Sequence, residues 1–313
     1  MLAYVIRRLF ATIVVMTVVA FVVFSLLYLT PGDPAAVIAG DAATSDDIRR
    51  IRANLGLDEP FLIRFGGWVW GLAHGDLGTS IFTNLPVTHL IAQRIEPTLS
   101  LTLCTLLVAV LVAVPLGVIA AAKAGTWIDR MVMAFSVLGF SVPVFVLAYI
   151  LILVFSIELD WLPVQGYRNI HENFWDWLRH LILPSIALGT VYIALIARMT
   201  RASMLDVLAQ DYIRTAQAKG LAPQAVLVGH ALKNAAVPIV TTIGIGIALL
   251  IGGAVVTESV FAIPGLGRLT VDAILRRDYP IIQGVILIFS AVYVLVNLLV
   301  DLSYVFFDPR IRY

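Results

Sequence analysis

The chain has 313 residues, of which 60% are hydrophobic and 13% are charged, and its mean hydropathy is +0.97. Soluble domains carry about 25% charged residues, so this composition excludes an ordinary soluble protein and predicts an integral membrane protein in a lipid bilayer. The net charge of +1 provides no broad basic field, which argues against nucleic acid as a partner. The single cysteine, Cys104, lies in an apolar run, where a packing role is simpler than redox or metal chemistry.

Six apolar runs are long enough to cross the hydrocarbon layer as helices, which takes roughly 20 residues each. Prolines at Pro115, Pro143 and Pro184 predict kinks, because neighbouring helices satisfy the carbonyls that proline leaves free. The first run is about twice as long as a signal-peptide core, so we interpret it as a retained span. The predicted spans are 9–29, 98–122, 131–157, 180–198, 237–257 and 281–306.

Lysines and arginines in the short loops predict the orientation, because such residues favour the cytoplasmic side. With the N-terminus inside, the inner segments hold Arg7, Arg8, Lys123, Arg130, Arg198, Arg201, Arg214, Lys219, Lys233, Arg310 and Arg312. The short outer loops hold Arg168, Arg179, Arg268, Arg276 and Arg277, which acidic residues accompany. Both termini are therefore predicted to be cytoplasmic. The predicted organisation is a first span with its N-terminal end (1–29), an extracytoplasmic segment (30–97), a five-helix core (98–306) and a cytoplasmic tail (307–313).

The extracytoplasmic segment 30–97 has its own helical pattern. Ser45 is predicted to cap a helix that Gly56 ends, and Asp46 and Asp47 lie in its first turn. A second helix from Pro60 carries a one-sided apolar stripe that suits the outer membrane interface: Phe61, Phe65, Trp68, Val69 and Leu72. This segment forms either a packed cap over the helix ends or a contact with a delivered substrate or its carrier.

Catalytic and cofactor motifs are missing from the sequence. The chain has no phosphate-binding glycine loop, no His/Cys cluster with metal-ligand spacing, and no serine in a nucleophile motif, so neither an enzyme nor a bound cofactor or metal is predicted. Carboxylates are also missing from the middle of the spans, since Glu258 and Asp301 lie near the ends. Ion-coupled transporters usually place ionisable groups near the middle of the membrane, so a self-contained ion-coupled transporter ranks only as a second hypothesis, and a membrane-embedded enzyme is the third.

One cytoplasmic loop, 199–236, is long and has no apolar core of its own. Residues 200–219 favour a helix, Gly220 suits a left-handed stop, and Pro223 suits the first turn of a short helix that precedes re-entry into the membrane at Pro238. A short helix displayed at a turn has little stability alone, which fits insertion into a groove of a partner. A solvated hairpin is the alternative.

Motifs along nearly the whole chain carry a family resemblance. The stretch RTAQAKGL at 214–221, followed by HALKN at 230–234, resembles the EAA loop of bacterial ABC importer permeases of the dipeptide/oligopeptide/nickel (glutathione) subfamily. The chain departs from the general motif at Arg214, which replaces a glutamate, and at Thr215, which replaces an alanine. Further matching motifs are TPGDP (30–34), LGLDEPF (55–61), HGDLGTS (74–80), SVPVF (141–145), ARMTRASMLDVL (197–208), ESVFAIPGLGRL (258–269), RDYP (277–280) and DPRIRY (308–313).

The resemblance implies an all-α permease with six transmembrane helices and the type I (MetI-like) importer fold in a bacterial inner membrane. The implied partners are a second homologous permease, two cytoplasmic P-loop ATPases that bind ATP and magnesium, and an extracytoplasmic substrate-binding protein. A coupling helix is implied at about 221–231. The implied coupling residues are Arg214, Thr215, Ala216, Lys219, Gly220, Leu221, His230 and Asn234.

Two further sets of residues are functional candidates. Ser141, Pro143, Gly244 and Gly252 would line the translocation pathway, although bending and close helix packing explain them equally well. An extracytoplasmic loop that forms either a structural turn or a contact with the binding protein holds Pro264, Gly265, Gly267, Asp278, Tyr279 and Pro280. The substrate is expected to be a dipeptide, an oligopeptide or a related solute such as glutathione.

Overall fold

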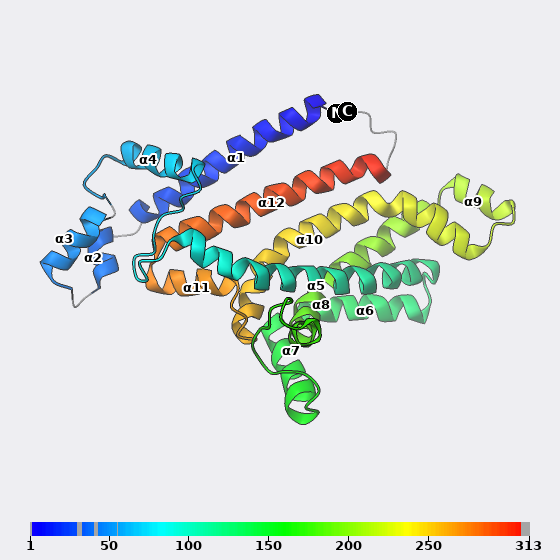
Figure 1. Ribbon diagram of the computed structural model, residues 1–313. Coiled ribbons are helices and arrows are strands. Elements are labelled where there is room, and N and C mark those ends of the chain that lie inside the picture. The colour runs from blue at the N-terminus through cyan, green and yellow to red at the C-terminus, as the bar shows by residue number, and fades with distance from the viewer. Residues whose placement is uncertain (1, 30–32, 41–42, 55, 308–313) are drawn as a thin grey trace. The chain divides into compact units, whose positions relative to one another are not determined.

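The computed structural model describes residues 2–29, 33–40, 43–54 and 56–307. The start of the TPGDP motif, Leu55 and the predicted tail from residue 308 onward lie outside the described residues. In the described part, helices carry almost the whole structure, with an isolated β-bridge between Thr79 and Pro86 (Figure 1). They are α1 (Leu2–Leu29), α2 (Pro34–Ala39), α3 (Ser45–Asn54), α4 (Phe61–Ala73), α5 (Val87–Ala122), α6 (Trp127–Ser141), α7 (Val144–Leu151), η1 (Ile152–Glu158), α8 (Phe174–Leu208), α9 (Asp211–Ala218), η2 (Ala225–Leu232), α10 (Lys233–Val260), α11 (Leu266–Arg276) and α12 (Tyr279–Phe307), where η marks π-helix.

The membrane-spanning helices confirm the all-α class. Among the described residues, five continuous helical stretches are long and apolar enough to cross a membrane, and a bent pair raises the number to six. The predicted span 131–157 is wrong in detail, because α6 and the stretch from α7 through η1 meet at an angle of 101°. Val142, which precedes Pro143, adopts extended backbone angles (φ −88°, ψ 121°), since a following proline disfavours the helical region. The expected kink is therefore a break.

Contacts between residues divide the chain into two compact units. Unit 1 consists of Glu96–Gly267 with the described residues of Leu295–Tyr313, and unit 2 consists of Leu2–Ile95 with Arg268–Val294. The domain boundaries predicted from the sequence stay predictions.

Helix α8 is the centre of unit 1. Its membrane-spanning window is 67% buried, the highest share among the spans, and it packs against α6, α7 and α10. Pro184 lies inside this helix without ending it, as expected for a proline whose neighbours are packed around it. The main apolar core gathers around α8 and includes Leu101, Ile152, Leu181, Leu188, Tyr192, Ile196, Leu250 and Phe261.

An aromatic cluster joins α4 to α1 in unit 2. Phe24 lies 5.5 Å from Phe61, 5.5 Å from Phe65 and 5.2 Å from Trp68 between ring centroids. The spacing of Phe61, Phe65 and Trp68 puts them on one face of α4, which confirms the predicted apolar stripe for these three residues. Helix α4 begins directly after Pro60, as the sequence predicts.

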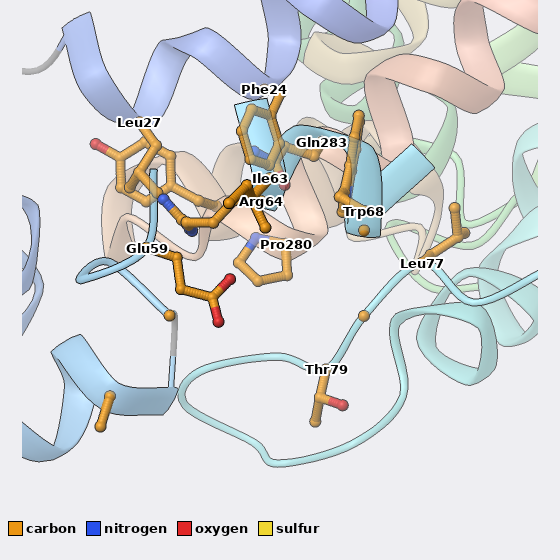
Figure 2. A pocket seen from close by; sticks show the side chains of 15 residues that line it. Phe24, Leu27, Glu59, Ile63, Arg64, Trp68, Leu77, Thr79, Pro280 and Gln283 are labelled. Carbon is orange, nitrogen blue, oxygen red and sulfur yellow. The ribbon is translucent and has the colours of Figure 1, made fainter. Parts of the chain in front are cut away.

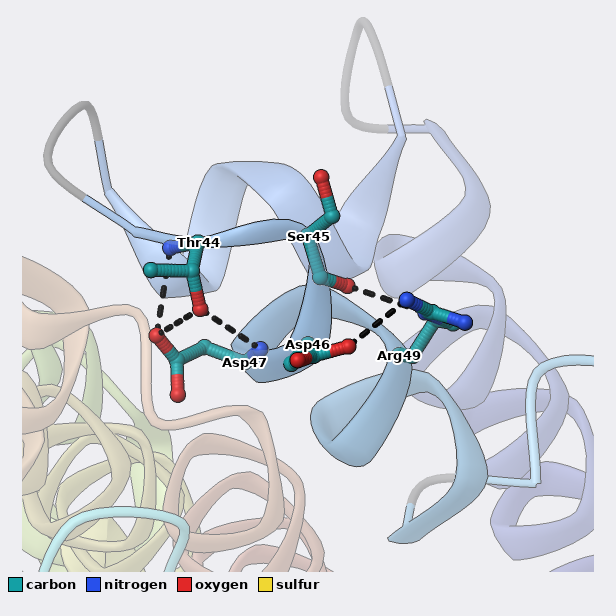
Figure 3. A network of polar contacts seen from close by, with 5 residues as sticks. All are labelled: Thr44, Ser45, Asp46, Asp47 and Arg49. Atoms are coloured by element: carbon teal, nitrogen blue, oxygen red, sulfur yellow. Dashed lines mark hydrogen bonds and ion pairs between the residues drawn. The ribbon is translucent and has the colours of Figure 1, made fainter.

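Helix α3 begins with a cap at a residue other than the predicted Ser45. The Thr44 hydroxyl accepts a hydrogen bond from the Asp47 backbone N–H at 3.3 Å, and the Asp47 carboxylate accepts from the Thr44 backbone N–H at 3.1 Å (Figure 3). This reciprocal pair makes Thr44 the N-cap, while Ser45 is the first residue of the helix. Asp47 stands three residues after Thr44, the spacing that lets both bonds form. Gly56 has a φ of +59° after the helix, as a left-handed stop requires.

Candidate coupling site

The first arm of the long loop consists of two helices. Helix α8 runs to Leu208, and α9 begins at Asp211 after Gln210 adopts an extended conformation (φ −77°, ψ 147°). The prediction of one helix over 200–219 was therefore wrong. The break turns the chain so that Ile213 becomes fully buried, and burial of this side chain outweighs the good helix propensity of the segment.

Gly220 makes the turn between the two arms. Its φ is +78°, and its backbone N–H donates to the carbonyl of Gln217 at 2.9 Å. No heavy atom lies within 4 Å of the place where a Cβ would stand. Glycine is needed here for its left-handed backbone and not for lack of space.

The second arm is continuous with the next membrane span. Helical structure begins at Pro223, continues as the π-helix η2 and passes directly into α10. The predicted short helix with a separate re-entry at Pro238 was wrong, because Pro238 lies inside α10. Buried Ala235 and Ile239 hold the helix on both sides of this proline, so its missing N–H does not end the helix. Figure 1 shows α9 at the ends of α8 and α10, where the chain reverses direction.

The two arms share a small apolar core. Ile213 and Ala216 of α9 pack with Val226 and Ala231 of η2, and Met204 of α8 lies in the same cluster. Ala216 is the one predicted coupling residue that is buried, which fits a small side chain where two helices approach closely. The other predicted coupling residues are exposed: Arg214, Thr215, Lys219, Gly220, Leu221, His230 and Asn234.

The exposed side of this hairpin is both cationic and apolar. Val228 is 60% exposed, Tyr212 is 46% exposed and Leu221 is 38% exposed. Arg214 pairs with Asp211 at 3.5 Å, but both side chains are open to solvent, so this ion pair contributes little to stability. We name this exposed side, formed by residues 211–234, the coupling surface. Its apolar side chains are not covered by the hairpin and are open to contact with a partner.

An ion pair that was not predicted from the sequence holds the base of this hairpin. Arg201 of α8 contacts the Asp129 carboxylate of α6 through two bonds, Nε to Oδ1 at 2.5 Å and Nη2 to Oδ2 at 2.7 Å. The backbone N–H of Gly125 donates to the same carboxylate at 3.0 Å. Asp129 is 4% exposed, and the partly buried Arg201 guanidinium neutralises its charge. The signal for this pair in the sequence is an acidic residue at the end of one apolar helix and a basic residue at the end of another.

The PGLG loop (264–267) packs around a buried carboxylate. Glu258 is fully buried and accepts a hydrogen bond from the Thr98 hydroxyl at 2.7 Å, while the Leu266 backbone N–H donates to that hydroxyl at 2.8 Å. A Cβ on Gly265 would stand 2.2 Å from the Glu258 carboxyl carbon, and one on Gly267 would stand 2.7 Å from the Val255 Cα. Both glycines are buried and Pro264 is exposed. These glycines are required because there is no room for a side chain.

The RDYP motif carries a second buried carboxylate, in unit 2. Asp278 is 2% exposed and accepts a hydrogen bond from the Ser80 hydroxyl at 2.5 Å. The Ile81 backbone N–H donates to the other carboxylate oxygen at 3.3 Å. This contact joins the RDYP motif to the end of the HGDLGTS motif, almost 200 residues apart in sequence. Tyr279 and Pro280 lie beside it, half-buried.

The four candidate pathway residues divide between two stretches of unit 1. The Ser141 hydroxyl donates to the Val137 carbonyl of its own helix at 2.9 Å, directly before the break at Pro143. A Cβ on Gly244 would stand 2.3 Å from a Val300 methyl carbon, so this glycine allows α10 and α12 to pack closely, whereas the space around Gly252 is open. Their roles in a pathway stay predictions. Among the described residues, no three His, Cys, Asp or Glu side chains gather as metal ligands would.

Known proteins match almost the whole chain. Residues 113–313 match the family described as "Binding-protein-dependent transport system inner membrane component", and residues 1–102 match the N-terminal part of such membrane components. A probable peptide ABC transporter permease of Sinorhizobium fredii is 55% identical, with 99% of each chain covered. The glutathione transport system permease GsiC of Escherichia coli O6:H1 is 45% identical, and the dipeptide transport system permease DppB of Alkalihalophilus pseudofirmus is 42% identical, each with full coverage of both chains.

The fold also matches a solved structure. An inward-facing structure of the MetNI methionine ABC transporter covers 70% of this chain and 96% of its own, with a TM-score of 0.58 and 18% sequence identity. This likeness confirms the predicted MetI-like fold. Together with the family match over both parts of the sequence, it favours the permease over the enzyme and secondary-transporter alternatives. The chain therefore belongs to the binding-protein-dependent inner-membrane components, as a multi-pass permease subunit of an ABC importer.

Proposed function

We propose that this permease imports small peptides or a related solute such as glutathione. The proposal is supported by relatives named for peptide, dipeptide and glutathione transport, each matching nearly the full length of the chain. The chain would form half of the translocation pathway, with a second homologous permease as the other half. An extracytoplasmic binding protein would deliver the substrate, and two cytoplasmic ATPases would bind ATP and magnesium.

The coupling surface would dock into these ATPases. The observation that carries this proposal is the division of the hairpin into a buried stripe, with Ile213 and Ala216, and an exposed side with Leu221 and Val228. A helix pair that keeps its small side chains inside and offers both apolar and cationic side chains outside fits insertion into a groove. ATP-driven movement of that groove would then reach the spans directly, since η2 continues into α10 without a break. With the coupling surface in the cytoplasm, the predicted spans would put both termini in the cytoplasm as well.

Cysteine chemistry tests both docking and orientation. In a Cys104→Ser background, Val228→Cys should cross-link to the ATPase and react with an impermeant maleimide from the cytoplasmic side. Leu275→Cys is the matched control, because Leu275 is 77% exposed in α11 and should react from the opposite side without cross-linking. Equal cross-linking of both cysteines to the ATPase would contradict the docking, and labelling from reversed sides would contradict the orientation.

Reconstitution tests the substrate and the energy source. The complete complex in proteoliposomes should import a labelled dipeptide or glutathione with external binding protein and internal ATP. Uptake should persist when ion gradients are dissipated and should stop when ATP is replaced by ADP. If neither solute is transported while ATP hydrolysis responds to the binding protein, the permease role stands and the proposed substrate class is wrong.

A further inference from the structure

A cavity of about 600 Å³ in unit 2 has no role in the coupling proposed above. Its walls come from α1, α4, the start of α12 and the loops around residues 56–59 and 77–79. Figure 2 shows Glu59, Arg64 and Pro280 around the same space. A volume of this size falls in the range of small-molecule sites, which run from about 300 to 1,000 Å³.

One wall of the cavity is apolar and belongs to a membrane span. Phe24 and Leu27 lie in the last two turns of the span Phe10–Leu29, and Trp68 of α4 packs against Phe24. Earlier in the same span, side chains such as Phe10 and Ile13 are more than 60% exposed, as lipid-facing residues are. The end of a span is where hydrocarbon gives way to lipid headgroups, and tryptophan is enriched there. The cavity therefore opens at the level of the headgroups.

The polar lining holds two opposite charges that do not neutralise each other. Glu59 and Arg64 both border the cavity, yet no ion pair joins them among the described contacts. The Arg64 guanidinium is held against the apolar wall, because it donates to the Tyr28 hydroxyl and lies 5.5 Å from the centroid of the Phe24 ring. The Glu59 carboxylate makes no hydrogen bond or ion pair with the described residues and is exposed to the cavity. Separated charges of this kind suit the two ends of a zwitterion.

A buried amide adds a further polar group. Gln283 of α12 is 6% exposed and lines the cavity, and its side chain makes no hydrogen bond to the described part of the chain. Since Gln283 lines the cavity, its amide can donate to and accept from a molecule that occupies this space. A ligand with both donors and acceptors would satisfy it.

We propose that this cavity binds the headgroup of an aminophospholipid. The primary ammonium donates to the Glu59 carboxylate and the Gln283 carbonyl, the phosphate accepts from Arg64, and the acyl chains follow the apolar surface of α1 into the bilayer. Phosphatidylcholine offers a cation that cannot donate a hydrogen bond, and phosphatidylglycerol offers no cation. The site should therefore prefer phosphatidylethanolamine to both. A small peptide carries the same charged ends but lacks the chains that match the membrane-facing wall, so the lipid is the better match.

Two adjacent glycines provide a matched pair of variants. Gly66 and Gly67 both lie in α4, and no heavy atom stands within 4 Å of a Cβ added at either position, yet Gly67 borders the cavity and Gly66 does not. Gly67→Leu should fill the cavity, whereas Gly66→Leu makes the same change in helix propensity and surface without filling it. Glu59→Gln keeps the shape of the side chain and removes its charge.

The test measures lipid retained by the complete importer after purification from nanodiscs. Nanodiscs of phosphatidylcholine are supplemented with phosphatidylethanolamine or phosphatidylglycerol, and bound lipid is counted by native mass spectrometry. Wild type and Gly66→Leu should retain phosphatidylethanolamine selectively. Glu59→Gln should lower that retention about tenfold, the effect of losing one charge-assisted contact, and Gly67→Leu should lower it at least as much because its side chain occupies the site.

Three outcomes would overturn the proposal. Equal retention of all lipids by wild type would remove the selectivity, and unchanged retention in Gly67→Leu would place the lipid elsewhere. Displacement of the lipid by a dipeptide, or binding of a labelled dipeptide that Gly67→Leu abolishes and Gly66→Leu does not, would assign the cavity to peptide instead. Co-purification of the ATPases with every variant shows that the complex has assembled, so loss of binding is separated from misfolding.

Discussion

Two glycine-containing turns of unit 1 are built on opposite principles. At the coupling turn, Gly220 stands in open space with a φ of +78°. In the PGLG loop, Gly265 and Gly267 have no positive φ, but a Cβ on Gly265 would stand 2.2 Å from the carboxyl carbon of buried Glu258. The first turn needs glycine for its backbone conformation, and the second needs glycine because a side chain would not fit. The same residue type in two sequence motifs therefore predicts different responses to mutation.

The largest effect is expected in the PGLG loop. Gly267→Ala places a methyl group 2.7 Å from the Cα of Val255, a backbone atom that cannot rotate away, which costs about 3 kcal/mol. The amount of folded protein in the membrane should fall severalfold, as measured by size-exclusion fluorescence and thermal unfolding. If Gly267→Ala reached the membrane in normal amounts with normal stability, the turn would have room for a side chain and the contrast with Gly220 would be wrong.

At the coupling turn the expected effect falls on transport and not on folding. Gly220→Arg should reduce uptake about tenfold or more, because a non-glycine residue strains the left-handed turn by about 1–2 kcal/mol and distorts the coupling surface, while the protein still reaches the membrane. Gly220→Asn is the control, since asparagine tolerates this conformation and should keep most of the uptake. If Gly220→Arg transports normally, the turn geometry has no role in coupling.

A smaller loss is expected when the buried hydrogen bonds of the PGLG loop are removed without adding volume. Thr98→Val keeps the shape of the side chain but removes the bonds to Glu258 and to the Leu266 N–H, at a cost of about 2 kcal/mol. The midpoint of thermal unfolding should fall by a few degrees, which is less than in Gly267→Ala. An unchanged midpoint would mean that the carboxylate and not the threonine orders the loop.

The smallest effect is expected when the exposed threonine–carboxylate contact at the start of α3, between Thr44 and Asp47, is removed. The Thr44 hydroxyl and backbone N–H hold the pKa of Asp47 below its usual value. The lowered pKa stabilises the start of α3 at pH above about 4, and this stabilisation is lost as the pH falls through the folded-state pKa. Hydrogen exchange of residues 45–54, corrected for intrinsic rates, should rise below about pH 4 in wild type and should already be raised at neutral pH in Thr44→Val. The same profile in both proteins would show that the cap is inert.

The positions of the helices and turns follow from the sequence, but the way in which successive helices connect does not. Apolar runs of about 20 residues predict spans whatever surrounds them, and Gly220 marks a turn because few other residues adopt its φ. The break between α8 and α9 escaped prediction, since it depends on burial of Ile213 against Met204, residues that come together through folding. The continuity of η2 and α10 through Pro238 escaped it for the same reason, because neighbouring packing compensates for the proline.

The sequence by itself determined the membrane class, the family and the position of the coupling turn, because hydropathy, charge and motif spacing are local properties. The tertiary structure alone decided which carboxylates are buried and which side chains hold them. Asp129 and Arg201 are 72 residues apart, and Ser80 and Asp278 are 198 residues apart. A carboxylate in a sequence looks the same whether it faces water or a guanidinium, and the three-dimensional contact decides which of these stabilises its charge.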